Sequence, residues 1–443
     1  MAEIGSDHDR ACWLAEAQPY EPAPPLDRDE TVDVAVIGGG LTGVSSAWHL
    51  SRRFPDRRIA LLEARVLGNG ASGRSGGQAL TGINGIEPTE PAEIRRIYEV
   101  TRGGIDLIAE WVERHGLDAG FSRRGCLEVY TFPRTAEAAH ARAERWNRAG
   151  VPVEWLPGSA SGIDGARGAL RDPACGRVNG TALLRGLRPV LVEQGVAVHE
   201  RTPVVRIEEG RVIRLTTPGG EVRAGAVVLA TNAYTPRLGY FGESVLPLHS
   251  HVIATSPLPA ERWAALGWGA HDGFADDRDR ITFGCRTAGG RLLFGGGGND
   301  AYGYSYGGDP VYRGAGSGRA FSALERRLLA CFPAAGALPI AHRWTGAIDL
   351  SLDRVCSMGV RGAHRNVYFA LGFSGHGVSL AALAGRVLCD LYAGDHDPWR
   401  DLPFYQRRLP RLPPEPLRWL GYQLYTRLTG RSPRRRGARR ARS

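Results

Sequence analysis

The sequence contains no lysine, and all 56 of its basic residues are arginines. A chain without lysine has no ε-amino group to form a Schiff base, to act as a general base or to activate oxygen as an ammonium. It also has no run of about 18 apolar residues, so we expect no membrane-spanning helix. The polar and acidic start, residues 1–9, lacks the basic region and apolar core of a secretory signal.

Cysteine pairs with metal-binding or redox spacing are also absent. The seven cysteines are scattered along the chain, and no two of them form a C-x-x-C motif. An odd and dispersed set is typical of reduced thiols, so we predict a cytoplasmic protein without a disulfide framework and without a metal site. The residues are Cys12, Cys126, Cys175, Cys285, Cys331, Cys356 and Cys389.

Positive charge is concentrated at the C-terminus. The net charge is +10, but seven arginines lie between Arg431 and Arg442, and the rest of the chain carries only +3. We predict a basic, disordered tail over residues 431–443. A short arginine run without a nucleic-acid-binding fold is weak evidence for such a partner, so no nucleic-acid binding is expected.

A glycine-rich turn near the N-terminus carries the most specific signal. The apolar, β-branched run Val32 to Ile37 predicts a buried strand, and a helical pattern follows from Leu41 to about Arg53. Between them stands the pattern G-x-G-x-x-G, and a second strand, Arg58 to Leu62, ends on an acidic residue. This order of elements is the dinucleotide-binding fingerprint. Its residues are Gly38, Gly40, Gly43 and Glu63.

Each of these residues has a physical role in such a site. Gly38 permits the tight turn, Gly40 leaves room for the pyrophosphate, and Gly43 allows close packing of the helix on the strand. The helix N-terminus offers N–H groups and partial positive charge to the phosphates. Glu63 is placed to accept hydrogen bonds from the ribose hydroxyls and would repel a 2′-phosphate. This disfavours NADP, and FAD and NAD remain.

Two further glycine-rich segments point to a ligand. Residues 70–78, Gly-Ala-Ser-Gly-Arg-Ser-Gly-Gly-Gln, are too rich in glycine for a helix or a central strand. Later, the buried strand pattern Val367 to Leu371 runs into Gly-Phe-Ser-Gly-His-Gly, residues 372–377, and a helix from Val378 to Ala393 follows. This second strand–glycine–helix unit, residues 367–393, returns the chain to the cofactor domain.

Together, the three motifs closely resemble those of the D-amino acid oxidase family of FAD-dependent amine oxidoreductases, and among its branches the γ-glutamylputrescine oxidases. The resemblance spans about residues 31–395. It implies an α/β fold in which a Rossmann-like FAD-binding domain adjoins a second, mixed β-sheet substrate domain, the architecture called glutathione-reductase-2-like. On this reading residues 1–30 form an N-terminal arm, residues 31–90, 150–239 and 341–397 form the FAD domain, and residues 91–149 and 240–340 form the substrate domain.

The resemblance also implies a set of FAD contacts. The glycine turn, with Leu41 and Thr42, would hold the pyrophosphate, and Glu63 with Ala64 and Arg65 would hold the ribose region. Val204 would give a backbone contact to adenine, while Ala230 and Thr231 would lie near the pyrophosphate. The ribityl chain and the flavin ring would be lined by Ser72, Arg74, Ser75, Gly76, Gly77 and Gln78, and the pyrimidine side of the ring by Gly346, Gly372, Phe373, Gly375, His376, Gly377 and Val378.

Several departures from relatives refine this expectation. Some relatives tether FAD through a histidine in the second motif, where this chain has Arg74, and others through a cysteine that would fall within residues 343–349, where this chain has none. We therefore predict non-covalent FAD. Sarcosine oxidases use a lysine at a place that matches about Ser379, and an oxygen-reactive lysine at a place near Leu293. Their absence makes a small N-methyl amino acid a poor substrate candidate and leaves the electron acceptor open.

The predicted reaction is oxidation of an amine C–N bond, with hydride transfer to flavin N5 and hydrolysis of the imine to an aldehyde. The amine would be γ-glutamylputrescine-like, polyamine-like or derived from an amino acid. Two alternatives stay open: an NAD-linked dehydrogenase and a flavin-binding subunit without turnover. The candidate residues for contact with substrate are His251, Arg286, Trp344 and His376, and ordinary packing is the competing interpretation for each.

The C-terminal segment, residues 398–430, is proline-rich and then aromatic and amphipathic. We favour a terminal helix packed on the body. The sharper alternative is a helix that contacts a membrane surface or a partner. The sequence leaves the oligomeric state open.

Overall fold

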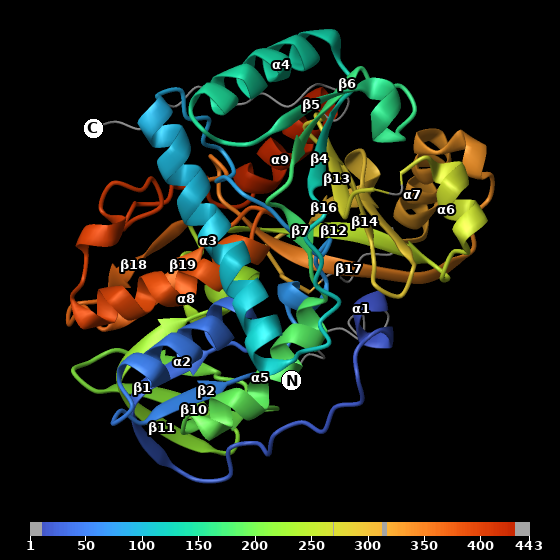
Figure 1. The fold of residues 1–443 in the computed structure, drawn as a ribbon. Coiled ribbons are helices and arrows are strands. Elements are labelled where there is room, and N and C mark those ends of the chain that lie inside the picture. Colours follow the sequence, from blue (N-terminus) through green and yellow to red (C-terminus); the bar gives the residue numbers. More distant parts are fainter. Residues whose placement is uncertain (1–10, 269, 312–316, 430–443) are drawn as a thin grey trace.

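The chain is organised by two β-sheets with helices around them (Figure 1). The computed structural model describes residues 11–268, 270–311 and 317–429. Within these residues, no helix has the length and apolar character needed to cross a bilayer. The predicted basic tail, residues 431–443, lies outside the described part of the chain.

The first sheet contains the predicted dinucleotide-binding unit. Its strands run in the order β18-β19-β11-β1-β2-β8, and β1 pairs in parallel with both β2 and β11. The hairpin strands β9 and β10 extend the sheet from β11. Its strands are β1 (Glu30–Ile37), β2 (Ile59–Leu62), β8 (Val196–His199), β9 (Arg206–Glu208), β10 (Ile213–Thr217), β11 (Gly220–Leu229), β18 (Ser357–Arg361) and β19 (Val367–Leu371).

Three helices pack on one face of this sheet in the lower half of Figure 1: α2 (Leu41–Arg53), α5 (Gly180–Glu193) and α8 (Val378–Ala393). The long helix α3 (Pro91–His115) packs on α8. Although Pro189 removes one backbone donor, α5 is one continuous helix through this residue. Two effects offset the lost hydrogen bond: the Asn179 side chain caps the N-terminus, and leucines such as Leu187 and Leu191 are fully buried.

The second sheet is mixed and contains nine strands among the described residues. Their order is β16-β12-β15-β14-β13-β4-β6-β5, and β17 pairs antiparallel with β12. The strands are β4 (Cys126–Tyr130), β5 (Glu154–Pro157), β6 (Gly168–Asp172), β12 (Leu246–Thr255), β13 (Gly273–Asp276), β14 (Thr282–Arg286), β15 (Leu292–Gly296), β16 (Tyr302–Tyr304) and β17 (Ile340–Leu350).

The composition of this sheet corrects two predicted domain boundaries. Strands β5 and β6 lie in the range 150–239, and β17 lies almost entirely in the range 341–397, both of which we had placed in the FAD domain. Instead, β6 pairs with β4, and β17 pairs with β12 along its whole length. These pairings join segments far apart in the sequence, and local hydrophobic patterns carry no information about them.

The remaining helices lie around the second sheet, except for a short one in the N-terminal arm. Two aromatic side chains, Trp13 and Tyr20, anchor that arm to the body of the protein. The indole of Trp13 is buried and donates to Ser75 O at 2.8 Å, while the Tyr20 hydroxyl donates to Glu200 at 2.7 Å. The helices are α1 (Cys12–Ala15), α4 (Pro133–Arg148), α6 (Ala260–Leu266), α7 (Ser317–Cys331) and α9 (Leu417–Thr429), and a two-stranded sheet joins β3 (Gln78–Ala79) to β7 (Gly176–Arg177).

Candidate active site

A cavity of about 2140 Å³ lies between the two sheets. Pockets for small ligands usually measure about 300–1,000 Å³, so this cavity has room for a dinucleotide and for a second molecule. Its wall contains the glycine turn after β1, the 70–78 loop, and the 373–378 segment before α8. The second sheet supplies the opposite wall through β12, β13 and β17.

The glycine turn combines two glycines that must be glycine for packing with one that faces open space. Gly38 has a φ of +110°, and a Cβ at this position would lie 2.6 Å from Ala230 O. A Cβ on Gly43 would overlap the carbonyl oxygen of Gly38. Within 4 Å a Cβ on Gly40 would meet only Ser72 Oγ, at 3.1 Å. Gly40 therefore leaves space on the cavity side at the start of α2.

Glu63 holds the backbone of this turn. Its carboxylate accepts the Gly39 N–H at 2.6 Å and the Arg65 N–H at 2.8 Å. Burial raises the pKa of Glu63, and these two backbone donors oppose the rise. Close by, Ser72 Oγ accepts the Leu41 N–H at 3.0 Å and so ties the second motif to the first turn of α2.

Arg74 is a buried cation on the wall of the cavity. Arg74 is only 7% exposed, and its Nε and Nη2 atoms have no hydrogen-bond partner among the described residues. Its Cβ lies 3.2 Å from the place where a Cβ would stand on Gly346 of β17. Arg74 matches the expected tethering histidine of some relatives, and Gly346 lies in the 343–349 stretch that matches the tethering cysteine of others. The structure thus brings these two places together. Gly346 has no side chain, and the guanidinium of Arg74 is a poor nucleophile.

The last glycine motif is held by a buried carboxyl group. Asp349 of β17 accepts the N–H of Gly372 at 2.6 Å. Burial raises the pKa of Asp349 to about 7, and backbone N–H donors of the motif oppose the rise. Asn84 donates to Ser374 O at 3.0 Å, and His376 Nε2 donates to Thr81 O at 2.8 Å. The motif is therefore fixed both to the second sheet and to the segment after β3.

Most of the predicted cofactor residues lie on the wall of this one cavity. Gly43 and Gly372 are the exceptions: Gly43 packs α2 on β1, and Gly372 lies behind the wall with a φ of +79°. The roles of the others in binding stay predictions. Those on the wall are Gly38, Gly40, Leu41, Thr42, Glu63, Ala64, Arg65, Ser72, Arg74, Ser75, Gly76, Gly77, Gln78, Val204, Ala230, Thr231, Gly346, Phe373, Gly375, His376, Gly377 and Val378.

Of the four candidate substrate residues, only His376 lines the cavity. His251 lies on the opposite face of β12, where its Nδ1 bonds to Ala301 O at 3.1 Å. The alternation of the strand explains this, because Leu248, Ser250 and Val252 take the cavity side. Arg286 stacks on the ring of Trp263 at 4.5 Å, and the buried Trp344 donates to Arg74 O at 3.0 Å. We therefore withdraw His251, Arg286 and Trp344 as catalytic candidates.

The two places at which a sarcosine oxidase would carry lysine are both structural here. Ser379 is buried and donates to Leu80 O, and it does not line the cavity. Leu293 is fully buried in a small apolar cluster that also contains Trp13 and Trp344. Neither position offers a cation to a substrate.

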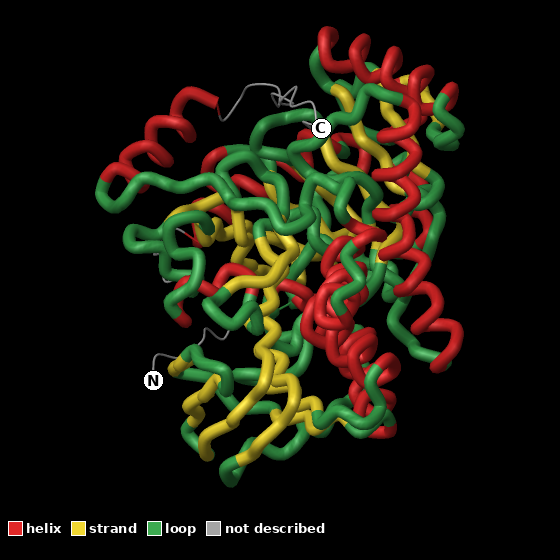
Figure 2. Tube along the Cα trace, turned by 90° about the vertical axis from the view of Figure 1, so that its left-hand side faces the viewer, coloured by secondary structure: helices red, strands yellow, loops and turns green. Residues whose placement is uncertain are grey.

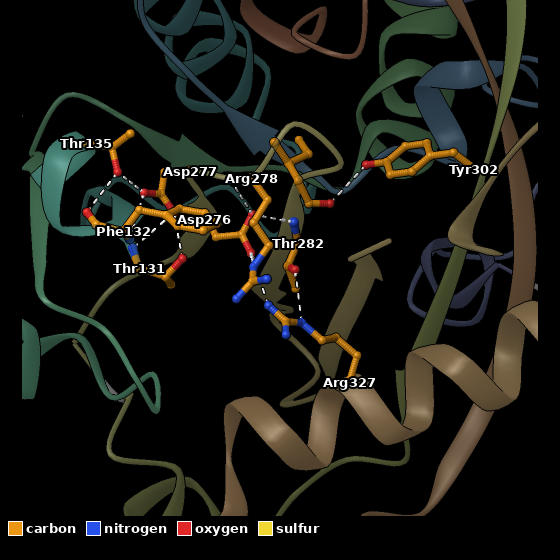
Figure 3. Close-up of polar contacts among 10 residues, drawn as sticks. Thr131, Phe132, Thr135, Asp276, Asp277, Arg278, Thr282, Tyr302 and Arg327 are labelled. Atoms are coloured by element: carbon orange, nitrogen blue, oxygen red, sulfur yellow. Dashed lines mark hydrogen bonds and ion pairs between the residues drawn. The ribbon is translucent and has the colours of Figure 1, made fainter. Parts of the chain in front are cut away.

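Asp276, the last residue of β13, and the following Asp277 are paired within the protein (Figure 3). Asp276 accepts the Thr282 N–H at 2.7 Å and lies 3.1 Å from Arg278 and 3.4 Å from Arg327. Asp277 accepts hydrogen bonds from the backbone and side chain of Thr131, at 3.0 and 2.9 Å, and fixes the chain just before α4. These carboxylates order the wall and are engaged within the protein.

Sequence reasoning missed three parts of the wall. One is the segment after β3, residues 80–88, where Gly82 and Gly85 adopt φ values of +82° and +84°. Its Thr-Gly-Ile-Asn-Gly run was a signal that could have found it. The second is Asp349, an acidic residue inside an otherwise buried strand pattern. The third is α9, whose residues Tyr422 and Tyr425 line the cavity and which no local signal connects to it.

The residues present fit FAD. The open face of Gly40 at a helix N-terminus suits a pyrophosphate, and the unpartnered guanidinium of Arg74 and the amide oxygen of Gln78 are buried polar atoms that lack partners in the described chain. No cluster of metal-ligating side chains occurs among the described residues.

Residues 33–391 match the family of FAD dependent oxidoreductases, and the chain belongs to this family. It is 30% identical to the gamma-glutamylputrescine oxidoreductase of Escherichia coli strain K12, over 90% of this chain and 93% of that one. A glycine oxidase of Geobacillus kaustophilus is 28% identical over 51% of this chain and 62% of its own length. The protein is an FAD-dependent oxidoreductase whose relatives act on amines and amino acids.

Solved structures share the fold. The crystal structure of glycine oxidase from Geobacillus kaustophilus superimposes with a TM-score of 0.71 at 24% identity, covering 86% of this chain and 99% of that one. That of L-proline dehydrogenase from P. horikoshii gives a TM-score of 0.67 at 22% identity, covering 83% and 94%. The predicted two-domain α/β architecture is therefore confirmed.

Proposed function

We propose that this protein oxidises a C–N bond of an amine, with γ-glutamylated or polyamine-like amines as the preferred substrate class. The observation that carries this proposal is that the three glycine motifs and the second sheet line one cavity, which has room for a dinucleotide and for a second molecule. The substrate class rests on the similarity to the gamma-glutamylputrescine oxidoreductase of Escherichia coli along nearly the whole chain. When bound, FAD would accept hydride at N5 from the carbon next to the amine nitrogen, and the resulting imine would hydrolyse to an aldehyde.

The protein's own contribution is positioning, electrostatics and exclusion of water. The α2 N-terminus and Gly40 would hold the pyrophosphate, and Glu63 the ribose. Arg74 would offer its unpartnered guanidinium to an electron-rich part of the ligand. The 373–378 segment would present backbone N–H groups, which Asp349 holds in place from behind.

We propose that FAD is bound without a covalent link. The support is local: the position that matches a relative's tethering histidine is Arg74, and the stretch where a tethering cysteine would fall contains none. Two cysteines, Cys126 and Cys175, do line the cavity, and burial raises the pKa of both thiols. Acid precipitation should leave a colourless pellet and a yellow supernatant. A yellow pellet would contradict this part of the proposal.

The function is tested by anaerobic reduction of the flavin. The purified protein, with its flavin absorbance recorded, is mixed without oxygen with γ-glutamylputrescine, putrescine, glycine and sarcosine in separate runs. We expect rapid bleaching by γ-glutamylputrescine or putrescine, and slow or no bleaching by sarcosine. Mixing the reduced protein with oxygen or with a quinone then identifies the electron acceptor.

Each other outcome refutes a defined part of the proposal. Bleaching by glycine or sarcosine alone would overturn the substrate class but keep the reaction type. No bleaching by any amine would favour the flavin-binding subunit. The NAD-linked alternative requires a protein without flavin absorbance, and membership of the FAD-dependent family argues against it.

A further inference from the structure

Helix α9 carries an apolar stripe that faces solvent. Leu417, Leu420, Leu424 and Leu428 recur every three or four residues, so they share one face of the helix. Each is more than half exposed, from 51% at Leu420 to 70% at Leu428. We call these four residues the leucine stripe. An apolar surface of this kind marks an interaction site more often than it stays exposed to water.

The opposite face of α9 already holds the helix to the body. Trp419 and Tyr422 pack against the core of the second sheet. The Tyr425 hydroxyl donates to Asp279 at 2.8 Å, and Thr426 accepts Arg280 at 2.8 Å. The leucine stripe is therefore not needed to fix α9 in place. Figure 2 shows α9 at the margin of the molecule, as the helix at the upper left.

Positive charge adjoins the leucine stripe. At about 100° per residue, Arg427 lies on one flank of the stripe, whereas Arg418 lies on the cavity side of the helix, where its Nε donates to Pro413 O. The seven arginines between Arg431 and Arg442 follow in the sequence, and no acidic residue occurs after Glu415. An outward apolar face with an arginine at its edge and an arginine-rich continuation in the sequence is the pattern of a helix that lies in a membrane interface.

We propose that the leucine stripe of α9 binds the surface of an anionic lipid bilayer, with α9 parallel to the bilayer plane. A bilayer offers an apolar phase to the leucines and anionic headgroups to the arginines. A second copy of the chain carries the same net charge of +10, and like charges at an interface disfavour that pairing.

Binding through α9 would also set how the cavity is oriented relative to the lipid surface. Leu417 and Leu428 are at once stripe residues and part of the cavity wall. Protein bound through α9 therefore turns this end of the cavity towards the lipid surface. This inference does not depend on which amine is oxidised.

The test measures flotation of the flavin-loaded, full-length protein with lipid vesicles. We expect binding to vesicles of phosphatidylcholine with phosphatidylglycerol. Binding to vesicles of pure phosphatidylcholine, or at high salt, should be weaker by at least about tenfold. The double variant Leu420→Glu/Leu424→Glu should lose binding at least about tenfold, since it puts two charges into the apolar contact. Neither residue lines the cavity, so flavin content and amine-dependent bleaching report that the variant is folded.

A matched control is Leu329→Glu, which introduces the same charge at a leucine of α7 that is 48% exposed. It should bind vesicles like the wild type. Replacing Arg434, Arg435 and Arg436 together by glutamine should weaken binding to anionic vesicles and leave binding to neutral ones unchanged.

Three results would overturn the proposal. The first is no binding to anionic vesicles, and the second is equal binding to neutral and anionic vesicles. The third is wild-type binding by Leu420→Glu/Leu424→Glu. If light scattering instead shows a dimer that this variant converts to a monomer, with no vesicle binding by the wild type, the stripe is a contact between copies.

Discussion

Gly40 and Gly43 stand three residues apart in the same turn, yet the structure gives their replacement by alanine different consequences. At Gly43 a methyl group would overlap the carbonyl oxygen of Gly38, so β1 and α2 must move apart. Overpacking of this kind costs about 3 kcal/mol, and the better helix propensity of alanine returns about 1 kcal/mol. We expect Gly43→Ala to lower the free energy of unfolding by about 2 kcal/mol or more.

At Gly40 the same methyl group meets only Ser72 Oγ, at 3.1 Å, and otherwise points into the cavity. The loss of a glycine at the N-cap costs about 1 kcal/mol or less. The methyl group would, however, occupy the space that we assign to the pyrophosphate. A displacement worth about 1.4–3 kcal/mol lowers FAD affinity about 10- to 100-fold. Gly40→Ala should therefore separate cofactor binding from folding.

The assay compares apoprotein and cofactor binding in the same preparations. Urea unfolding followed by tryptophan fluorescence gives the stability of the apoprotein, and titration with FAD followed by flavin fluorescence gives the affinity. Gly103→Ala is the matched control, because Gly103 lies inside α3 and a Cβ there would meet no atom within 4 Å. It should bind FAD like the wild type and be equally or slightly more stable.

The placement of the pyrophosphate at Gly40 would be refuted by a Gly40→Ala protein that binds FAD with wild-type affinity. Equal loss of apoprotein stability in the Gly40 and Gly43 variants would refute the packing argument instead. A Gly43→Ala protein as stable as the wild type would show that β1 and α2 can separate at little cost.

Three other substitutions test the site. Arg74→Met should leave apoprotein stability unchanged or higher, since it removes an unpartnered buried charge, while FAD affinity falls about tenfold; lower stability with normal affinity would contradict this. The pKa of Asp349 is raised to about 7, so its stabilisation is complete below pH 4 and lost by pH 7. Asp349→Asn should remove this pH dependence, worth up to about 3 kcal/mol in urea unfolding between pH 5 and 8, and unchanged pH dependence would refute the assignment. Arg286→Met should keep kcat/KM within about twofold, because Arg286 stacks on Trp263 outside the cavity, whereas a tenfold loss would return Arg286 to the site.

Local signals sufficed for the elements that are predicted to bind the dinucleotide. The turn at Gly38 to Gly43 and the segment 372–377 follow buried strands, and both strands lie in the parallel sheet that the pattern predicts. Parallel strands buried on both faces produce continuous apolar runs, which are easy to recognise. The predicted FAD dependence and family membership were confirmed on this basis.

The second sheet shows where sequence patterns stop being informative. Strand β12 is buried at all ten positions, so its sequence does not alternate between apolar and polar residues. Without alternation, nothing indicates whether His249 and His251 or Ser250 and Val252 face the cavity, and a shift of one residue exchanges the two faces. The cytoplasmic location stays a prediction.

The absence of lysine has a consequence for how the cavity can respond to pH. An arginine side chain keeps its charge throughout the working range of an enzyme, unlike a buried lysine, which readily loses its proton. Arg74 therefore supplies a constant positive charge beside Gly346. Asp349 lies on the same wall, and burial raises its pKa to about 7, so its charge changes near neutral pH. A change in flavin binding near pH 7 that depends on Asp349 should accordingly vanish in Asp349→Asn and persist in Arg74→Met, and its persistence in Asp349→Asn would refute the assignment to Asp349.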